Sequence, residues 1–189
     1  MTIKNKNIIL RYIKEEDIKD YIRWTTVETE WNEWDAPWEE NDWGEFIEWR
    51  KDELKETPKI FSRLEIDTVT GRHIGWVSSY FIDGIKEKRA VGGSIIPVSD
   101  RGKGYGENAF TLFMAYLFNT EETLYTQTWS GNNSMLKLAE KIGFAEVERE
   151  KNYRMVRGEY YDGLTFSISK NNFFGKYVEL LSVNKSNNQ

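Results

Sequence analysis

The sequence predicts an α/β fold in which helices cover the faces of a mixed β-sheet. The chain has 189 residues, of which 39 % are apolar and 15 % aromatic, and this composition suits one domain with a sizeable core. Segments with strand and helix patterns follow in the order β, α, α, β, β, β, α, β, α, β, β, without an internal repeat. That order differs from the regular alternation of a parallel sheet and therefore favours a mixed one.

The N-terminal half supplies the first strand, two helices and a hairpin. Apolar residues alternate at 7–13, which predicts a strand, and recur at helical spacing at 14–26, which predicts an amphipathic helix. A break at Pro37 follows, because the residue before a proline avoids the helical region, and a second helix is expected from Asn41 onward. Two strand-like runs in 60–82, joined by a glycine turn, predict a hairpin.

Five further elements complete the predicted fold. They are a strand at 90–98, a helix at 107–120, a strand at 123–129, a helix at 132–143 and a hairpin at 144–170 that turns at 157–158. Pro97 ends the first of these strands because proline cannot donate to the ladder. Gly143 suits the left-handed residue that closes a helix C-terminus.

Composition excludes several classes of function. The chain has no cysteine and one histidine, so it offers no disulfide, no thiolate site and no multi-histidine metal cluster, and we expect no metal. A net charge of −5 argues against nucleic-acid binding. We expect no membrane partner, because no apolar run reaches the length of a transmembrane helix and the N-terminus lacks a signal-peptide pattern. A cytoplasmic protein is the expectation.

The segment SDRGKGYGENAF, residues 99–110, indicates an anion site. It places glycines at every second position between a strand and a helix N-terminus, where free N–H groups and the helix dipole favour negative charge. The Walker A pattern does not fit because Gly104 follows Lys103, and the dinucleotide pattern does not fit because the loop comes after at least four strands. A glycine turn without any ligand is the alternative.

Two segments resemble the motifs of the GNAT N-acetyltransferase superfamily. Arg101, Gly104 and Gly106 match the loop R/Q-x-x-G-x-G/A that binds acyl-CoA in that family. The segment NNSMLKLAEKIGF matches a second motif through Asn132, Leu138, Lys141, Gly143 and Phe144. The likeness runs from Ile8 to Ser169, and both chain ends look most like the branch that contains ribosomal-protein N-terminal acetyltransferases.

This resemblance implies a mainly antiparallel central sheet with helices on both faces and a splayed strand pair that holds acyl-CoA. It implies one catalytic domain at 1–170, followed by an extension at 171–189 with a short helix and a polar tail. Acetyl-CoA is the implied co-substrate. The residues expected to bind it are Ile95, Ile96, Val98, Arg101, Gly102, Lys103, Gly104, Tyr105, Gly106 and Asn132.

The groups that move protons in the family are absent at their usual positions. The tyrosine that protonates the thiolate is replaced by Ala139, the carboxylate base by Gln127, and a serine used by some relatives by Met135. Either water relays the protons, or another residue has taken the role. The candidates are Ser134, which is rotated by about 100° from Met135 on a helix, Glu65, and the tyrosine pair Tyr160 and Tyr161.

The acceptor site is expected in the acidic, tryptophan-rich segment 28–56, which carries twelve acids and three bases. Trp34, Asp35 and Trp38 are its candidate substrate-binding residues, because carboxylates beside indoles suit a cationic amine. The alternative is that the tryptophans pack on the sheet and the acids form a solvated face. His73, beside the glycine turn, is expected at the surface.

The resemblance implies an acetyl-CoA-dependent N-acetyltransferase that acts on a primary amine, either a peptide N-terminus or a small cationic amine. A catalytically silent acyl-CoA sensor is the alternative, favoured by the missing acid and base. An O-acyltransferase or an enzyme for longer acyl chains is a third possibility. A homodimer is possible, since dimers are common in the family.

Overall fold

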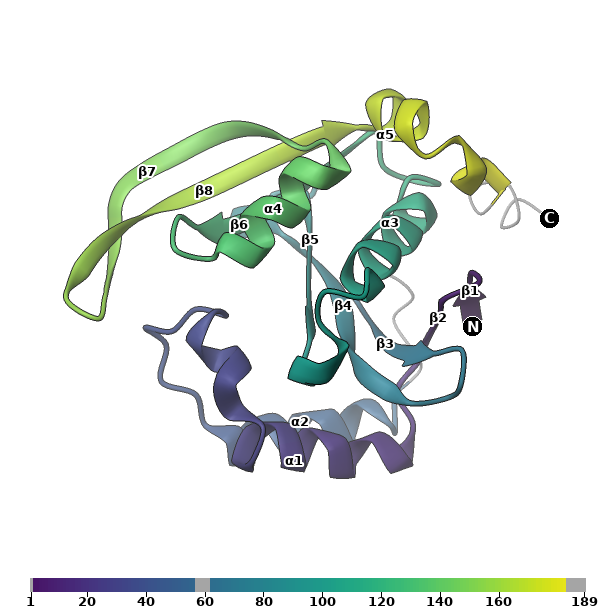
Figure 1. The fold of residues 1–189 in the computed structure, drawn as a ribbon, viewed down its shortest axis with the longest axis vertical. Coiled ribbons are helices and arrows are strands. Elements are labelled where there is room, and N and C mark those ends of the chain that lie inside the picture. The colour runs from purple at the N-terminus through teal and green to yellow at the C-terminus, as the bar shows by residue number, and fades with distance from the viewer. Residues whose placement is uncertain (1, 57–61, 183–189) are drawn as a thin grey trace.

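The computed structural model describes residues 2–56 and 62–182, and its centre is an eight-stranded sheet with the order β1-β2-β3-β4-β5-β6-β8-β7 (Figure 1). The strands are β1 (Thr2–Lys4), β2 (Ile8–Arg11), β3 (Arg63–Thr68), β4 (His73–Phe81), β5 (Arg89–Ile95), β6 (Thr123–Trp129), β7 (Ala145–Val156) and β8 (Glu159–Ser169). The helices are α1 (Ile18–Thr26), α2 (Trp43–Glu53), α3 (Tyr105–Leu117), α4 (Asn133–Ile142) and α5 (Lys170–Lys176). Every neighbouring pair is antiparallel except β5 and β6, which confirms the mixed, mainly antiparallel sheet.

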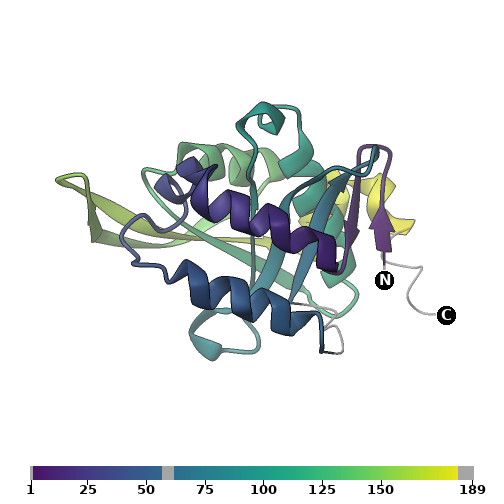
Figure 2. The same ribbon diagram turned by 90° about the horizontal axis from the view of Figure 1, so that it is seen from below.

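Helices lie on both faces of this sheet, as predicted. On one face α3, α4 and α5 bury a large core that contains the fully buried Phe113, Phe118 and Phe173. On the other face α1 and α2 run side by side (Figure 2) and cover a smaller core around Trp24 and Trp76. None of the helices in residues 2–56 and 62–182 has the length and apolar character needed to cross a bilayer.

The structure contains two elements that the sequence did not predict. Strand β1 was missed because three residues are too few to show an alternating pattern. The tryptophan-rich segment begins with a short 3-10 helix, η2 (Thr29–Glu33). Residues 60–61 of the predicted hairpin lie outside the described residues.

The C-terminal helix packs on the body of the protein. Phe173 and Phe174 of α5 are buried, and their rings lie 5.1 and 5.8 Å from that of Phe118 at the end of α3. The division into a domain at 1–170 and an extension at 171–189 stays a prediction, and the polar tail at 183–189 lies outside the described residues.

Strands β5 and β6 pair at one position and then separate. Ala90 of β5 pairs with Tyr125 of β6, and the parallel ladder has no second pair, although β5 stays paired with β4 along its whole length. The Thr126 hydroxyl donates to the Val91 carbonyl at 2.9 Å, and this bond lies at the point where the strands begin to diverge. The backbone edge of β5 beyond Val91 is therefore left open to a ligand.

A network of buried charges holds the smaller helical layer to the sheet. Arg11 of β2 donates to both oxygens of Asp17, at 2.6 and 2.8 Å, and to both oxygens of Asp67, at 2.5 and 2.8 Å. Glu65 of β3 accepts the hydroxyl of Tyr21 at 2.7 Å and forms an ion pair with Arg50 of α2. The network thus joins α1 and α2 to the strands below them.

His73 is part of this network, and the prediction that it lies at the surface is wrong. Its side chain is almost fully buried, with Nδ1 3.1 Å from Asp20 and Nε2 3.0 Å from Glu65. The prediction relied on the nearby glycine turn. His73 is instead the first residue of β4, and its side chain points toward α1. Asp17, Asp20 and His73 bring ligand-type atoms within 4.8 Å of one another, but Arg11 already engages both oxygens of Asp17.

The carboxylates around His73 keep it protonated. Burial by itself would lower its pKa, but the bonds to Asp20 and Glu65 and the charge of Asp17 raise the pKa from 6.5 to about 9. Glu65 responds in the opposite direction. Burial would raise its pKa, whereas the bond to His73 and the charge of Arg50 lower the pKa to about 2.

We therefore expect stability to depend on His73 in a defined pH window. Because the folded-state pKa is above the unfolded one, the stabilisation is complete below pH 6.5 and is lost as pH rises through about 9. The free energy of unfolding of the native protein should fall by roughly 3 kcal/mol over this window. Urea unfolding at several pH values measures the fall, and since His73 is the one histidine of the chain, His73→Gln should abolish it. Equal pH slopes in both proteins would contradict a charged His73.

Candidate active site

The separation of β5 and β6 opens into a cleft of about 930 Å³, called here the central cleft. Its walls come from β5 and β6, from the glycine loop at 101–106, from the segment 34–38 and from β7 and β8. A ligand in this cleft would contact the N-terminus of α3 at one end and the tryptophan-rich segment at the other. The cleft thus connects the two regions that the sequence singled out.

The glycine loop has the backbone geometry of an anion site. Gly102 and Gly104 have φ values of 74° and 80°, in the left-handed region that favours glycine, and Gly104 is the N-cap of α3. The first N–H groups of α3 have no acceptor within the helix and point toward the loop. Asn108 fixes the loop by donating from its amide nitrogen to the Gly104 carbonyl at 2.8 Å. No heavy atom lies within 4 Å of a Cβ placed at Gly102, so a phosphate can approach the backbone there.

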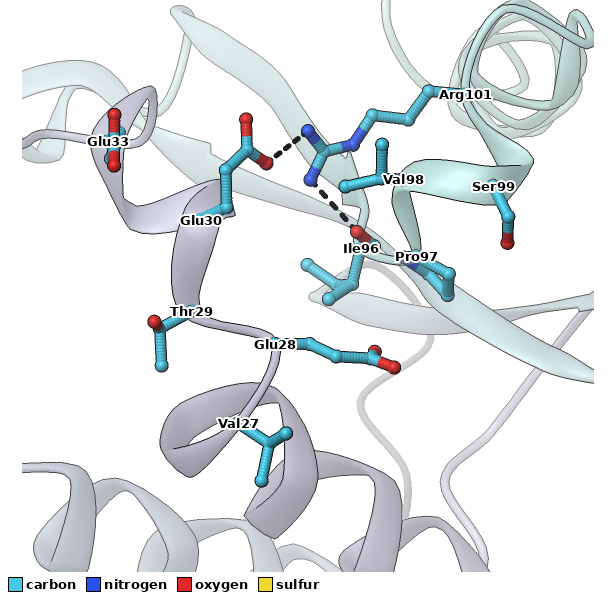
Figure 3. Close-up of a pocket in the computed structure, with 10 residues that line it drawn as sticks. All are labelled: Val27, Glu28, Thr29, Glu30, Glu33, Ile96, Pro97, Val98, Ser99 and Arg101. Carbon is cyan, nitrogen blue, oxygen red and sulfur yellow. Dashed lines mark hydrogen bonds and ion pairs between the residues drawn. The ribbon is translucent and has the colours of Figure 1, made fainter.

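The guanidinium of Arg101 is engaged by other residues of the chain (Figure 3). Its guanidinium donates to the carbonyls of Ile95 and Ile96, at 3.0 and 2.9 Å, and forms an ion pair with Glu30 of η2. The structure therefore places Arg101 as a brace between the end of β5 and η2, whereas the sequence prediction used it as charge for the pyrophosphate. Lys103 keeps an exposed ammonium 3.4 Å from a carboxylate oxygen of Asp100, which is fully buried and also pairs with Arg72.

The other predicted cofactor residues divide into two groups. The members that line the central cleft are Ile95, Arg101, Gly102, Gly104, Gly106 and Asn132. Ile96 is buried under α1, and the side chain of Tyr105 packs against the main core. Val98 is largely exposed and lines a second pocket, of about 470 Å³, together with three glutamates of the segment 28–33 (Figure 3).

Asn132 connects the two halves of the site. Its Oδ1 accepts the N–H of Met135 at 3.1 Å and caps α4, while its Nδ2 donates to the carbonyl of Trp34 at 3.0 Å. The same carbonyl accepts the indole N–H of Trp129 at 2.9 Å. The side chain of Asn132 therefore holds the acceptor segment against β6, in addition to lining the cleft.

The three candidate catalytic residues are not brought together. Ser134 is exposed in the first turn of α4 and lines the cleft. Glu65 is buried in the charge network and is outside the cleft lining, so its position does not favour contact with a substrate. Tyr161 is also outside the lining; its hydroxyl donates to Glu159 at 3.1 Å and its ring packs on Trp129.

The acceptor residues Trp34, Asp35 and Trp38 all line the central cleft. Trp38 makes edge contacts with Trp129 and with Tyr153 of β7, at centroid distances of 6.0 and 5.8 Å. The packing alternative holds for Trp31, which is buried against Trp76. The tryptophan segment thus serves both purposes, since all three indoles line the cleft and that of Trp31 is also buried in the smaller core.

Sequence reasoning missed the contribution of the outer strands. Glu148, Glu150 and Tyr153 of β7 line the cleft, and so does Tyr80 of β4, whose hydroxyl donates to Gln127 of β6 at 3.2 Å. Alternation along β7 was visible in the sequence, but the face that turns toward the cleft depends on the curvature of the long β7–β8 hairpin (Figure 1). No sequence signal pointed to Tyr80.

The comparison with known families agrees with this geometry. Residues 7–145 match the profile of the acetyltransferase (GNAT) domain family. The chain belongs to the GNAT acetyltransferase family. Among curated proteins, the GNAT chain is 25 % identical over 130 residues to the SPbeta prophage-derived uncharacterized N-acetyltransferase YokL of Bacillus subtilis (strain 168), covering 67 % of this chain and 70 % of that protein.

Solved structures share the GNAT fold at low sequence identity. The Vibrio cholerae spermidine N-acetyltransferase in complex with CoA and spermine is 18 % identical, with a TM-score of 0.72 over 90 % of this chain and 99 % of that one. RimL, a ribosomal L7/L12 α-N-protein acetyltransferase in complex with CoA, is 14 % identical, with a TM-score of 0.72 over 89 % and 98 %. The ribosomal-protein branch is thus one of several that this GNAT chain resembles.

The geometry of the glycine loop predicts that a substitution at Gly104 weakens the binding of acetyl-CoA. In Gly104→Val, a branched side chain must adopt the left-handed region at a cost of about 1–2 kcal/mol, and it also enters the space beside the free N–H groups. We expect acetyl-CoA to bind about tenfold more weakly or worse in isothermal titration calorimetry. Gly71→Val is the matched control, because Gly71 has a φ of 83° in an exposed turn outside the cleft. Equal binding by both variants would place the cofactor elsewhere.

Proposed function

We propose that the protein is an acetyl-CoA-dependent N-acetyltransferase that acts on a cationic primary amine, either a small amine or a peptide N-terminus. The observation that carries this proposal is the continuity of the central cleft. One cavity joins the N–H groups of the glycine loop, the open edge of β5 and a mouth lined by acids and aromatic rings. Family membership supports the reaction, and the mouth supports the class of acceptor.

The cofactor end fits the chemistry of coenzyme A. The loop at 102–106 and the N-terminus of α3 would bind the pyrophosphate, because backbone N–H groups and the helix dipole favour an anion. The open edge of β5 would hydrogen-bond the pantetheine amides in the way that a neighbouring strand does. A backbone N–H of the same edge can stabilise the negative charge that develops on the thioester oxygen.

The acceptor end favours a positive charge. Asp35, Glu148 and Glu150 line the cleft, and their carboxylates form no hydrogen bond or ion pair with any part of the chain that the structure describes. Trp38 and Tyr153 supply aromatic rings, which attract cations, and the guanidinium of Arg154 already lies 5.9 and 4.0 Å from their respective centroids. The similar structures include one enzyme named for a small amine, spermidine, and one named for a ribosomal protein.

The reaction is a direct attack of the amine nitrogen on the thioester carbon. The N–C bond forms, the C–S bond breaks, and the electron pair of that bond leaves with sulfur as a thiolate. The cleft contributes by holding the two reactants in contact, which replaces a bimolecular encounter with a unimolecular step. A homodimer and the absence of nucleic-acid and metal partners stay predictions.

Thiol release from acetyl-CoA in the presence of different amines tests the proposal. The panel should contain polyamines, aminoglycosides and short peptides with free N-termini. We expect turnover with one cationic class and little with a neutral amine of the same size, because free carboxylates line the mouth. The product's mass should increase by one acetyl group. Binding of acetyl-CoA without turnover of any amine would instead identify a sensor. Gln127 at the usual base position and Ala139 at the usual acid position favour that function.

A further inference from the structure

The proposed function leaves the movement of protons unassigned. In this chain Gln127 and Ala139 replace the carboxylate and the tyrosine that the family uses. Glu65 and Tyr161 do not line the central cleft. Two ionisable groups that do line it are Tyr80, which lies where β5 and β6 separate, and Asp35, in the segment 34–38.

The first group is the hydroxyl of Tyr80. Tyr80 pairs in the ladder with Ala90, the last residue of β5 before the strands diverge. Its ring passes over Gly92, where an added Cβ would lie 3.9 Å from the ring, and its hydroxyl donates to Gln127 Oε1 at 3.2 Å. Gln127 is held in turn by donating to Thr165 at 3.3 Å. The phenol thus spans the divergence from β4 to β6.

The second group is the carboxylate of Asp35. It follows η2, lines the cleft, and has no hydrogen-bond or ion-pair partner for its side chain among residues 2–56 and 62–182. Surrounding protein and the charge of Glu39 raise its pKa, against the opposing charge of Arg63. Burial and the negative charge of Asp35 raise the pKa of Tyr80 to about 12, so the hydroxyl keeps its proton.

The other acids of the cleft are already engaged or lie away from this point. Asp100 pairs with Arg72, and Glu107 pairs with Lys141 at 2.6 Å. Glu148 and Glu150 lie on β7, at the mouth, and Asp83 follows β4 beyond the Phe81–Arg89 pair, on the paired side of the divergence. Asp35 is therefore the unpaired carboxylate of the segment 34–38, which hydrogen bonds from Trp129 and Asn132 to the Trp34 carbonyl hold at the end of β6, beyond Gln127.

We propose that Asp35 accepts the proton of the attacking amine and that Tyr80, positioned by Gln127, donates a hydrogen bond to the thiolate leaving group. This inference rests on the proposed function. It assigns to Asp35 a role in the chemical step, beyond the contact with substrate that the sequence suggested. It gives Gln127 a positioning role at the place where relatives carry a base.

The proposed step conserves atoms and charge. The ammonium form of the acceptor first loses one proton to solvent. As the neutral nitrogen bonds to the carbonyl carbon, it becomes acidic, and its second proton passes to the carboxylate of Asp35. The C–S electron pair leaves with sulfur as a thiolate. The Tyr80 hydroxyl then donates its hydrogen bond to this sulfur instead of to Gln127. Such a charge-assisted bond is about twice as strong as a neutral one. Asp35 then returns its proton to solvent, and the thiolate takes a proton from solvent.

Steady-state kinetics of Asp35→Asn and Tyr80→Phe, with the best amine of the panel, test this inference. We expect kcat to fall about 100-fold in Asp35→Asn, the usual effect of losing a general base, with the dissociation constant of acetyl-CoA unchanged. The acidic limb of the kcat–pH profile should disappear in this variant. Tyr80→Phe should lower kcat about tenfold and leave the KM of the amine unchanged. Gln127→Glu should retain more activity than Gln127→Leu, because a carboxylate still accepts from the hydroxyl.

Two matched controls separate these effects from a general change of charge or polarity. Glu40→Gln removes a carboxylate from the same segment but outside the cleft lining, and Tyr12→Phe removes a tyrosine hydroxyl that also lies outside that lining. Both should have native kcat. If Asp35→Asn raises only the KM of the amine and keeps the pH limb, Asp35 binds substrate and the inference is overturned. If the native protein binds acetyl-CoA but acetylates no amine, the proposed function fails first and the inference fails with it.

Discussion

The site depends on one departure from regular sheet pairing, the separation of β5 from β6 after Ala90. Two continuous ladders hold the strands on either side, since β5 stays paired with β4 and β6 stays paired with β8 along its length. The opening therefore lies between two strands that are each fully paired on their other side, and it interrupts neither the β4–β5 nor the β6–β8 ladder. Unpaired backbone groups in a protein interior are expensive, and the open edge offers such groups to a ligand in the central cleft.

The cleft wall at residues 34–38 is supported in a different way. Its supporting helices, α1 and α2, bury only a small apolar core, and much of their attachment to the sheet comes from charges around Arg11, Glu65 and His73. Buried charges are costly unless they are paired and fully hydrogen-bonded. Here Arg11, Glu65 and His73 each meet two or more partners.

The order of elements and the glycine loop followed from local patterns, because strand alternation, helical spacing and left-handed glycines at positions 102, 104 and 143 are local properties. Long-range contacts were beyond such reasoning. His73 becomes buried because β4 packs under α1, and Tyr80 reaches Gln127 across 47 residues of sequence. Arg101 matched a motif, yet its bonds to Ile95, Ile96 and Glu30 depend on where η2 lies in space.

The segment between η2 and Trp38 is tied to both sides of the opening. Arg101 links Glu30 to the end of β5, and Asn132 and Trp129 link the Trp34 carbonyl to β6. The segment therefore bridges the gap between β5 and β6. The same few contacts thus hold the position of residues 34–38 and join the two strands that border the central cleft, so a change in the width of the cleft and a shift of this segment are coupled.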